Sequence, residues 1–190
     1  MASETPERFD TQQLSTETTN PRERAMVVRW IDPAYGPRLA AQRGLTGIEF
    51  LRAILNGELP PPPIAKLMSL EMVSVEDGCV VFAATPGEQH YNPLGVVHGG
   101  LAATLLDTAI GCAMQTKAPA GGFYTTIELK VNYLRPLLAG MGQVYGEATV
   151  LNTSRNLAFA EARVVGANGK LYAHATSTCM LVQPGVKEEK

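Results

Sequence analysis

The sequence is poor in cysteine: its 190 residues include only Cys79, Cys112 and Cys179, which are widely spaced and form no Cys-x-x-Cys pair. An odd number of isolated cysteines argues against a disulfide framework and against a zinc site built from paired thiolates. Sparse, unpaired cysteine is typical of proteins in a reducing compartment, so we expect a cytoplasmic location.

The sequence also lacks a long apolar run and a surplus of charge. No stretch approaches the roughly 20 residues of a membrane-spanning helix, and residues 1–22 show no basic segment followed by an apolar one, so we expect no signal peptide. The 16 basic and 18 acidic residues give a net charge of −2, which leaves no general attraction to nucleic acid or to anionic membranes. We therefore expect no nucleic-acid partner and no membrane partner.

What the chain does have is enough apolar sequence, 45% of its residues, to build a folded core. Composition divides it into four segments. Residues 1–22 are rich in Ser, Thr, Glu and Gln and are expected to form a loose, disordered tail. The other three are a leading helical and proline-rich extension over 23–64, a folded domain over 65–183 and a charged tail over 184–190.

The extension is expected to contain one helix. Apolar residues recur at helical spacing after Thr46, and Gly57 follows as a stop signal. The prolines from Pro60 to Pro63 then forbid regular structure, so this segment should separate the helix from the folded domain.

The folded domain shows two strands, one long helix and then four strands. Asp77-Gly78 lies between two apolar runs and predicts a hairpin, and Asn168-Gly169 predicts another. A single apolar helix can cover one face of an antiparallel sheet, so this order predicts an α+β domain with one buried helix. The expected elements are a hairpin over 69–85, a loop over 86–97, a helix over about 98–116, and strands over about 126–133, 142–151, 157–166 and 170–182.

The strand that begins at Thr126 alternates in polarity along its length. Its alternation gives the strand one polar face, with Thr126 and Glu128, and one apolar face, with Ile127 and Leu129. On this pattern Thr126 should lie on the polar face.

The predicted helix contains one carboxylate, Asp107, in a run that is otherwise almost wholly apolar or small. A helix that is apolar on all sides should be buried on all sides. Burying an ionised carboxylate without a partner is unfavourable. Asp107 is therefore either a structural residue that caps a loop or pairs with a basic group, or a reactive carboxylate.

The helix begins at His98-Gly99-Gly100, where free backbone N–H groups can bind an anion or a developing oxyanion. Glycine lets a substrate carbonyl come close to the backbone. Nine residues separate His98 from Asp107, a rise of roughly 13 Å along a helix, so the two cannot act on one carbon within one chain. A two-fold symmetric dimer could bring the Asp of one copy to the helix start of the other. The spacing therefore predicts an active site shared by two chains.

Three parts of the sequence resemble one known family: the run from Tyr91 to Gly100, the helix with Asp107, and the run from Thr125 to Pro136. They are similar to the hotdog-fold acyl-CoA thioesterases of the phenylacetate-degradation (PaaI-like) family, over roughly residues 65–183. The resemblance implies a hotdog fold, in which an antiparallel six-stranded sheet wraps around one long central helix. It also implies hydrolysis of an acyl-CoA to the free acid and CoA, with no cofactor beyond the CoA of the substrate.

The resemblance assigns catalytic roles to five residues. Gly99 would supply the backbone N–H that polarises the thioester carbonyl, and Asn92 would hydrogen-bond near the thioester. His98 would orient the loop and Asn92. Asp107 of a second copy would attack the carbonyl or activate a water, and Thr126 of that copy would position the water. The expected assembly is a homodimer or a dimer of dimers.

Three further residues are expected to bind the substrate or its CoA: Gly100, Arg135 and Arg155, with the two arginines as candidates for the CoA phosphates. The forked donors of arginine suit phosphate oxygens. For each arginine a solvated loop charge is an equally good interpretation.

Other functions fit the residues less well. His90 and His98 together with Asp107 match no zinc pattern, so we expect no metal site. A lipase-type oxyanion loop would need a Gly-x-Ser-x-Gly elbow, which the sequence lacks. Two alternatives remain: a non-catalytic hotdog domain that binds acyl-CoA, and a hotdog hydratase or dehydratase, whose catalytic His–acid arrangement we do not find.

Overall fold

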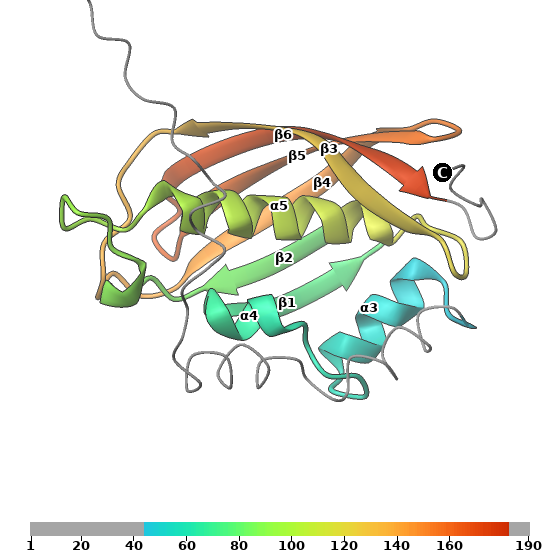
Figure 1. Cartoon of the computed structure of the whole chain (residues 1–190), viewed down its shortest axis with the longest axis horizontal. Coiled ribbons are helices and arrows are strands. Elements are labelled where there is room, and N and C mark those ends of the chain that lie inside the picture. The colour runs from blue at the N-terminus through green and yellow to red at the C-terminus, as the bar shows by residue number, and fades with distance from the viewer. Residues whose placement is uncertain (1–43, 183–190) are drawn as a thin grey trace, which may run out of the picture. The chain divides into compact units, whose positions relative to one another are not determined.

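The computed structural model describes residues 44–182, which form an α+β unit (Figure 1). The strands are β1 (Leu70–Glu76), β2 (Cys79–Ala84), β3 (Phe123–Tyr133), β4 (Val144–Thr153), β5 (Leu157–Gly166) and β6 (Leu171–Val182). The helices are α3 (Gly47–Leu55), α4 (Pro63–Leu67), the short 3-10 helix η2 (Glu88–His90) and α5 (Gly99–Gln115). The predictions for residues 1–22 and 184–190 lie outside the described residues.

The six strands form one antiparallel sheet in the order β1-β2-β4-β5-β6-β3, so that β1 and β3 are its edges. Helix α5 lies across one face of this sheet and packs against every strand (Figure 1). The predicted order of two strands, one long helix and four strands is confirmed, as is the α+β class. No helix within residues 44–182 is long and apolar enough to cross a membrane.

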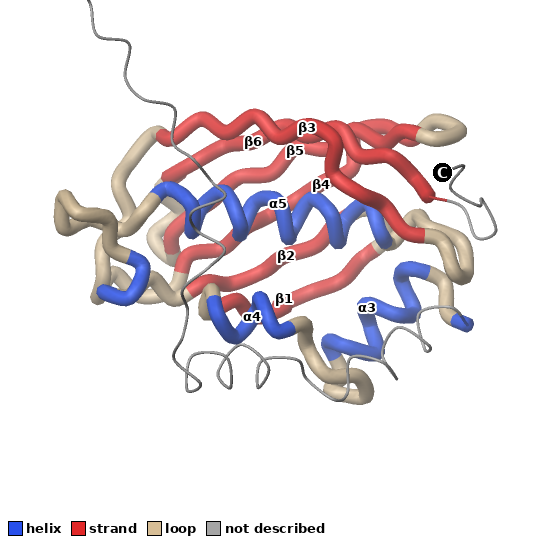
Figure 2. Tube along the Cα trace, in the orientation of Figure 1, coloured by secondary structure: helices blue, strands red, loops and turns tan. Residues whose placement is uncertain are grey.

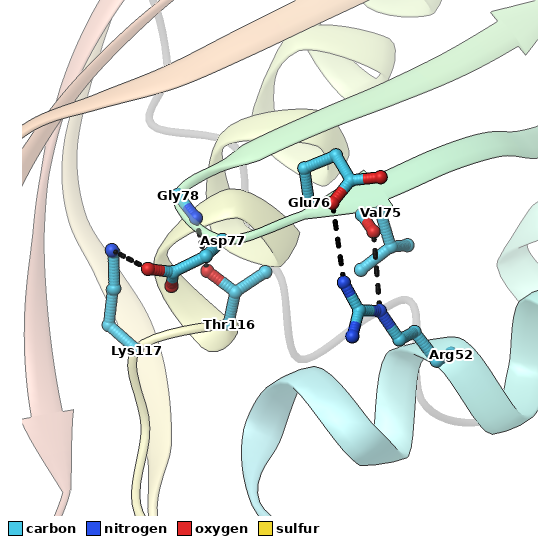
Figure 3. Close-up of polar contacts among 7 residues, drawn as sticks. All are labelled: Arg52, Val75, Glu76, Asp77, Gly78, Thr116 and Lys117. Atoms are coloured by element: carbon cyan, nitrogen blue, oxygen red, sulfur yellow. Dashed lines mark hydrogen bonds and ion pairs between the residues drawn. The ribbon is translucent and has the colours of Figure 1, made fainter.

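The hairpin predicted at Asp77-Gly78 is present and holds the C-terminal end of α5. Gly78 takes a left-handed conformation, with φ 78°, as the turn requires. Its N–H donates to Oγ1 of Thr116, which follows α5, over 2.8 Å (Figure 3). Asp77 forms an ion pair with Lys117 at 2.8 Å. These contacts join the hairpin to the C-terminal end of α5.

Helix α3 confirms the helix predicted between Thr46 and Gly57. The Glu49 carboxylate accepts hydrogen bonds from the N–H and the hydroxyl of Thr46, at 2.9 and 2.6 Å, which satisfies groups at the helix start. The buried face of α3 carries Phe50, Leu51 and Ile54 into the same core as α5. On its outer side Arg52 donates to the carbonyl of Val75 over 3.5 Å (Figure 3).

The prediction that the prolines forbid regular structure through Pro63 is wrong at its last residue. Pro63 is the first residue of α4. A proline is tolerated there because the first N–H of a helix has no partner inside the helix, and the proline ring already has a helical φ.

The prediction that α5 is buried on all sides is also wrong for the single chain. The large apolar residues of α5 face the sheet and are fully buried: Leu101, Leu105, Leu106, Ile110 and Met114. The sheet covers only this side. A stripe of small and polar residues on the other side stays partly exposed: Ala103, Thr104, Asp107, Thr108, Gly111 and Cys112. We call these six residues the open stripe of α5.

Strand β3, at the edge of the sheet beside β6 (Figure 2), does not alternate as predicted. Its register shifts between Thr126 and Glu128, so that one extra residue, Ile127, opposes β6. Thr126 pairs with the buried Cys179, whereas Glu128 pairs with Thr178. Residues paired across a ladder share a face. The bulge therefore turns Thr126 onto the face covered by α5, and the predicted polar-face position is corrected.

Candidate active site

At the start of α5, the backbone donor of Gly99 has no partner in the described part of the chain. His98 is the N-cap: its Nδ1 accepts the N–H of Gly100 at 2.8 Å, and its carbonyl oxygen accepts the N–H of Leu101 at 3.0 Å. The N–H of Gly99 has no acceptor among residues 44–182. Because this donor lies at the positive end of a 17-residue helix, it can stabilise negative charge on an oxygen that comes within hydrogen-bonding distance.

Gly100 serves this cap. Its N–H is already bound to His98, so it is not available to a substrate at the same time. A Cβ added at Gly100 would lie 2.8 Å from Nδ1 of His98, a contact too close to be tolerated without a shift. The glycine thus allows the cap, and Gly99 remains the donor that a carbonyl could use.

The loop before α5 is closed by Asn92. Its Oδ1 accepts the N–H groups of Leu94, at 2.9 Å, and Val96, at 3.4 Å. Its own N–H donates to the carbonyl of Val96 over 2.8 Å. The side chain that was expected near the thioester therefore has its carbonyl oxygen engaged in the loop. Its Nδ2 forms no hydrogen bond with any residue in 44–182, which leaves that amide able to reach a substrate.

An apolar cavity of about 320 Å³ lies beside Gly99. Most of its lining is aliphatic or aromatic: Val96, Val97, Ala102, Tyr133, Leu134, Pro136, Leu137, Tyr172 and Ala173. The ring of Tyr133 packs on Gly99 so closely that an added Cβ would lie 3.1 Å from it. Arg135 also lines the cavity, and its guanidinium donates to the carbonyl of Leu171 over 2.5 Å. The surroundings of the free N–H therefore suit an uncharged, apolar group.

Asp107 lies two turns along α5 from Gly99, in the open stripe. The hydroxyl of Thr126 donates to its Oδ1 over 2.9 Å, so the structure brings these two predicted residues together in one chain. Eight residues of helix separate Gly99 from Asp107, a rise of roughly 12 Å. The structure therefore does not bring Gly99 and Asp107 of one chain to one reacting atom.

Two residues that the sequence analysis missed lie behind Thr126. The thiol of Cys179 is 3.7 Å from Oγ1 of Thr126 and is fully buried. Its burial raises the pKa of the thiol, so Cys179 carries its proton at neutral pH and can donate it to the hydroxyl. Ser177, two residues earlier on the same face of β6, donates to the carbonyl of Glu128 over 2.6 Å. Alternation along β6 could have placed both residues on the helix face, but not opposite Thr126.

The two candidate arginines lie at opposite ends of β6. The backbone N–H of Arg135 donates to Tyr172 over 3.1 Å, near the start of the strand. Arg155 lies in the exposed turn between β4 and β5, whose Asn156 accepts the N–H of Leu181. Nine residues of strand between Tyr172 and Leu181 extend roughly 30 Å. Of the two candidate arginines, Arg135 is therefore the one that lies close to Gly99 of the same chain.

His90 is a structural residue of the loop. It is buried, its Nδ1 accepts the N–H of Gly87 at 3.1 Å, and its carbonyl accepts the N–H of His98 at 2.7 Å. In the described part of the chain no group of three His, Cys, Asp or Glu side chains is placed to hold a metal ion.

Comparison with known proteins connects this geometry to a family. The Thioesterase superfamily profile matches residues 94–173. A candidate esterase of Halobacterium salinarum is 40% identical over 82 residues, which are 42% of this chain and 48% of that protein. The chain thus spans about half the length of that relative. Human acyl-coenzyme A thioesterase 13 is 32% identical over 114 residues, 59% of this chain and 79% of that protein.

A solved structure is similar to this chain in both sequence and fold. A mutant of the phenylacetic acid degradation protein PaaI from Thermus thermophilus is 30% identical, with a TM-score of 0.57, and the match covers 62% of this chain and 97% of that one. The predicted hotdog fold, a six-stranded antiparallel sheet with one central helix, is confirmed. The chain belongs to the thioesterase superfamily, a family of thioester hydrolases.

Proposed function

We propose that this chain hydrolyses an acyl-CoA thioester to the free acid and CoA, at a site to which two copies of the chain contribute. One observation carries this proposal: the N–H of Gly99 at the start of α5 has no acceptor among residues 44–182, and two turns further along the helix Thr126 holds the Asp107 carboxylate. The first group can polarise a carbonyl, and the second can attack it or activate a water. The name of the human relative, an acyl-coenzyme A thioesterase, supports acyl-CoA as the substrate class.

Two features support a two-copy site. Strand β3 is an edge of the sheet, yet it exposes Phe123 (43%), Ile127 (55%) and Tyr133 (57%), and natural proteins usually cover such an edge. The open stripe of α5, which contains Asp107, is also partly exposed. A second copy related by a two-fold axis can cover both surfaces and bring each Asp107 to the other copy's Gly99. The assembly is therefore proposed to be a homodimer or a dimer of dimers.

The reaction follows from these groups. The carbonyl oxygen of the thioester accepts the N–H of Gly99, which stabilises the negative charge that develops on it. Asp107 of the second copy either takes a proton from an attacking water or attacks the carbon itself. A new C–O bond forms, the C–S bond breaks, and the thiolate of CoA leaves and takes up a proton. Where Asp107 attacks the carbon, water then hydrolyses the acyl–aspartate anhydride, which releases the free acid and restores the carboxylate. Thr126 bonds only one oxygen of Asp107, which leaves Oδ2 for this work.

The cavity beside Gly99 is proposed to hold the acyl group. Its volume of about 320 Å³ corresponds to about ten water molecules, which is room for a small aryl or short aliphatic acyl group. The CoA phosphates would then lie outside, at Arg135 and at Arg155 of the second copy. The reaction is proposed to need no cofactor beyond the CoA of the substrate.

The test is thiol release from a panel of acyl-CoA esters, with a matched pair of variants. Asp107→Asn should lower turnover at least about 100-fold while CoA binding, measured by calorimetry, is retained. Asp77→Asn, which changes an exposed carboxylate in a hairpin turn, should keep full turnover. Wild-type protein that binds acyl-CoA without releasing thiol would instead support a non-catalytic binding domain, and an active Asp107→Asn protein would contradict the mechanism.

A further inference from the structure

The contact between Thr126 and Asp107 depends on the bulge in β3. With regular alternation Thr126 would share a face with Glu128, which pairs with Thr178 on the side of the sheet away from α5. The extra residue, Ile127, places Thr126 instead on the α5 face, opposite the buried Cys179. A one-residue change of register inverts which face a side chain occupies. A residue that stabilises the bulge therefore also keeps the Thr126 hydroxyl within hydrogen-bonding distance of Asp107.

Ser177 is placed to hold it. A bulge interrupts the ladder and leaves backbone groups without their usual partners. The carbonyl of Glu128, directly after the bulged residue, accepts the hydroxyl of Ser177 over 2.6 Å. Ser177 is only 3% exposed, and a buried hydroxyl without a partner is unfavourable, so the bond stabilises both groups. The hydroxyl of Ser177 thus ties a backbone carbonyl next to the bulge to β6.

Cys179 acts on the hydroxyl itself. It lies directly opposite Thr126, with its Sγ 3.7 Å from Oγ1, and it is completely buried. A hydroxyl that accepts an S–H on one side directs its own proton elsewhere, and the other polar neighbour is Oδ1 of Asp107 at 2.9 Å. The thiol is also 3.9 Å from the hydroxyl of Ser177, which gives its own proton to Glu128. Through the shorter contact of the thiol, the order of donors runs from Cys179 to Thr126 to Asp107.

We propose that Ser177 and Cys179 are positioning residues of the hydrolytic site: Ser177 holds the β3 bulge that turns Thr126 towards α5, and Cys179 directs the proton of Thr126 to Asp107. Neither residue touches the substrate, and both act through Thr126. The expected changes in kcat rest on the proposed function. The placing of Thr126 by Ser177 and Cys179 rests only on the contacts among these residues.

A double-mutant cycle tests the kinetic part. Cys179→Ala should lower kcat about three- to tenfold with KM nearly unchanged, the effect of losing one hydrogen bond, and Cys179→Ser, which keeps a donor, should restore most of it. In a Thr126→Ala background, Cys179→Ala should cause no further loss. Equal losses of kcat in both backgrounds would show a merely structural role and overturn the proposal. Thr178→Ala, on the other face of β6, is the matched control and should leave kcat unchanged.

Crystal structures of the wild-type and Ser177→Ala proteins test the geometric part without any activity. We expect the distance between Oγ1 of Thr126 and Oδ1 of Asp107 to exceed about 3.5 Å in the variant, with the bulge lost or displaced. An unchanged bulge and contact would overturn the role of Ser177. Absence of hydrolysis by the wild-type protein would refute the proposed function alone, because these structures would still decide the role of Ser177.

Discussion

The hydroxyl of Thr126 lies 2.9 Å from Oδ1 of Asp107, although the two residues belong to the edge strand β3 and to the central helix α5. The contact requires an extra residue in the strand, and it fixes one oxygen of the one charged side chain of α5. The same helix offers its free N–H at Gly99, roughly 12 Å away. One helix thus carries a backbone donor and a carboxylate that it cannot bring to one reacting atom within a single chain.

The role of the Gly99 N–H can be tested by removing that group alone. Gly99→Pro deletes the N–H at the first position of a helix, where proline is tolerated, and His98 already has the extended conformation (φ −60°, ψ 134°) that precedes proline. We expect kcat to fall about 100- to 1,000-fold, as for the loss of one oxyanion donor. Steady-state kinetics of thiol release are the measurement.

Gly99→Ala is the control for that change. It keeps the N–H and adds only a Cβ, which would lie 3.1 Å from the flexible ring of Tyr133. We expect a loss well below that of Gly99→Pro. Equal losses in the two variants would show that the contact with Tyr133, and not the N–H, accounts for the effect.

The buried thiol of Cys179 predicts a dependence of stability on alkaline pH. Burial raises its pKa above the ordinary value of 9.0, so above that pH the unfolded chain loses the proton while the folded protein keeps it. Stability from this group is therefore fully present below about pH 9 and is lost as the pH rises through the folded pKa. Urea unfolding in reducing buffer at pH 8 and pH 10 should show a larger fall for the wild type than for Cys179→Ala. Parallel falls would contradict the assignment.

The link between the β1–β2 hairpin and α5 predicts a stability effect away from the active site. Thr116 is buried, and its hydroxyl accepts the N–H of Gly78 at 2.8 Å and donates to Ala113 at 2.6 Å. Thr116→Val keeps the shape and leaves that N–H without a partner, so unfolding by urea should show a loss of about 1–3 kcal/mol. Lys117→Met, which breaks an exposed ion pair with Asp77, should cost less than about 1 kcal/mol.

Much of this fold could be predicted from local sequence. The apolar run after His98-Gly99-Gly100 gives α5 to within a residue at each end, because a helix of that length and its cap are both local features. The Asp77-Gly78 turn and the strands after it depend on short-range patterns as well. For Asp107 the sequence left open a structural residue or a reactive carboxylate, and the structure adds that its partner within residues 44–182 is a hydroxyl, that of Thr126, and not a basic group.

What could not be predicted depends on which segments become neighbours. The bulge at Ile127 is set by the pairing of β3 with β6, so alternation within β3 alone gave the wrong face for Thr126. The sequence overestimates the burial of α5, because its apolar composition does not show that the sheet covers only one side of the helix in a single chain. The contact of Cys179 with Thr126 likewise depends on the pairing of β6 with β3, which are far apart in the sequence.

The central claim, that each site combines Gly99 of one copy with Asp107 of another, is tested most directly by mixing two inactive variants. Gly99→Pro and Asp107→Asn proteins, carrying different tags, are unfolded together, refolded, and checked for mixed dimers by native mass spectrometry. Every mixed dimer would then contain one intact site. With random pairing at equal amounts, half of the dimers are mixed, so the mixture should regain about a quarter of the wild-type activity. If mixed dimers form and no activity returns, each site lies within a single chain, and the shared-site account is contradicted.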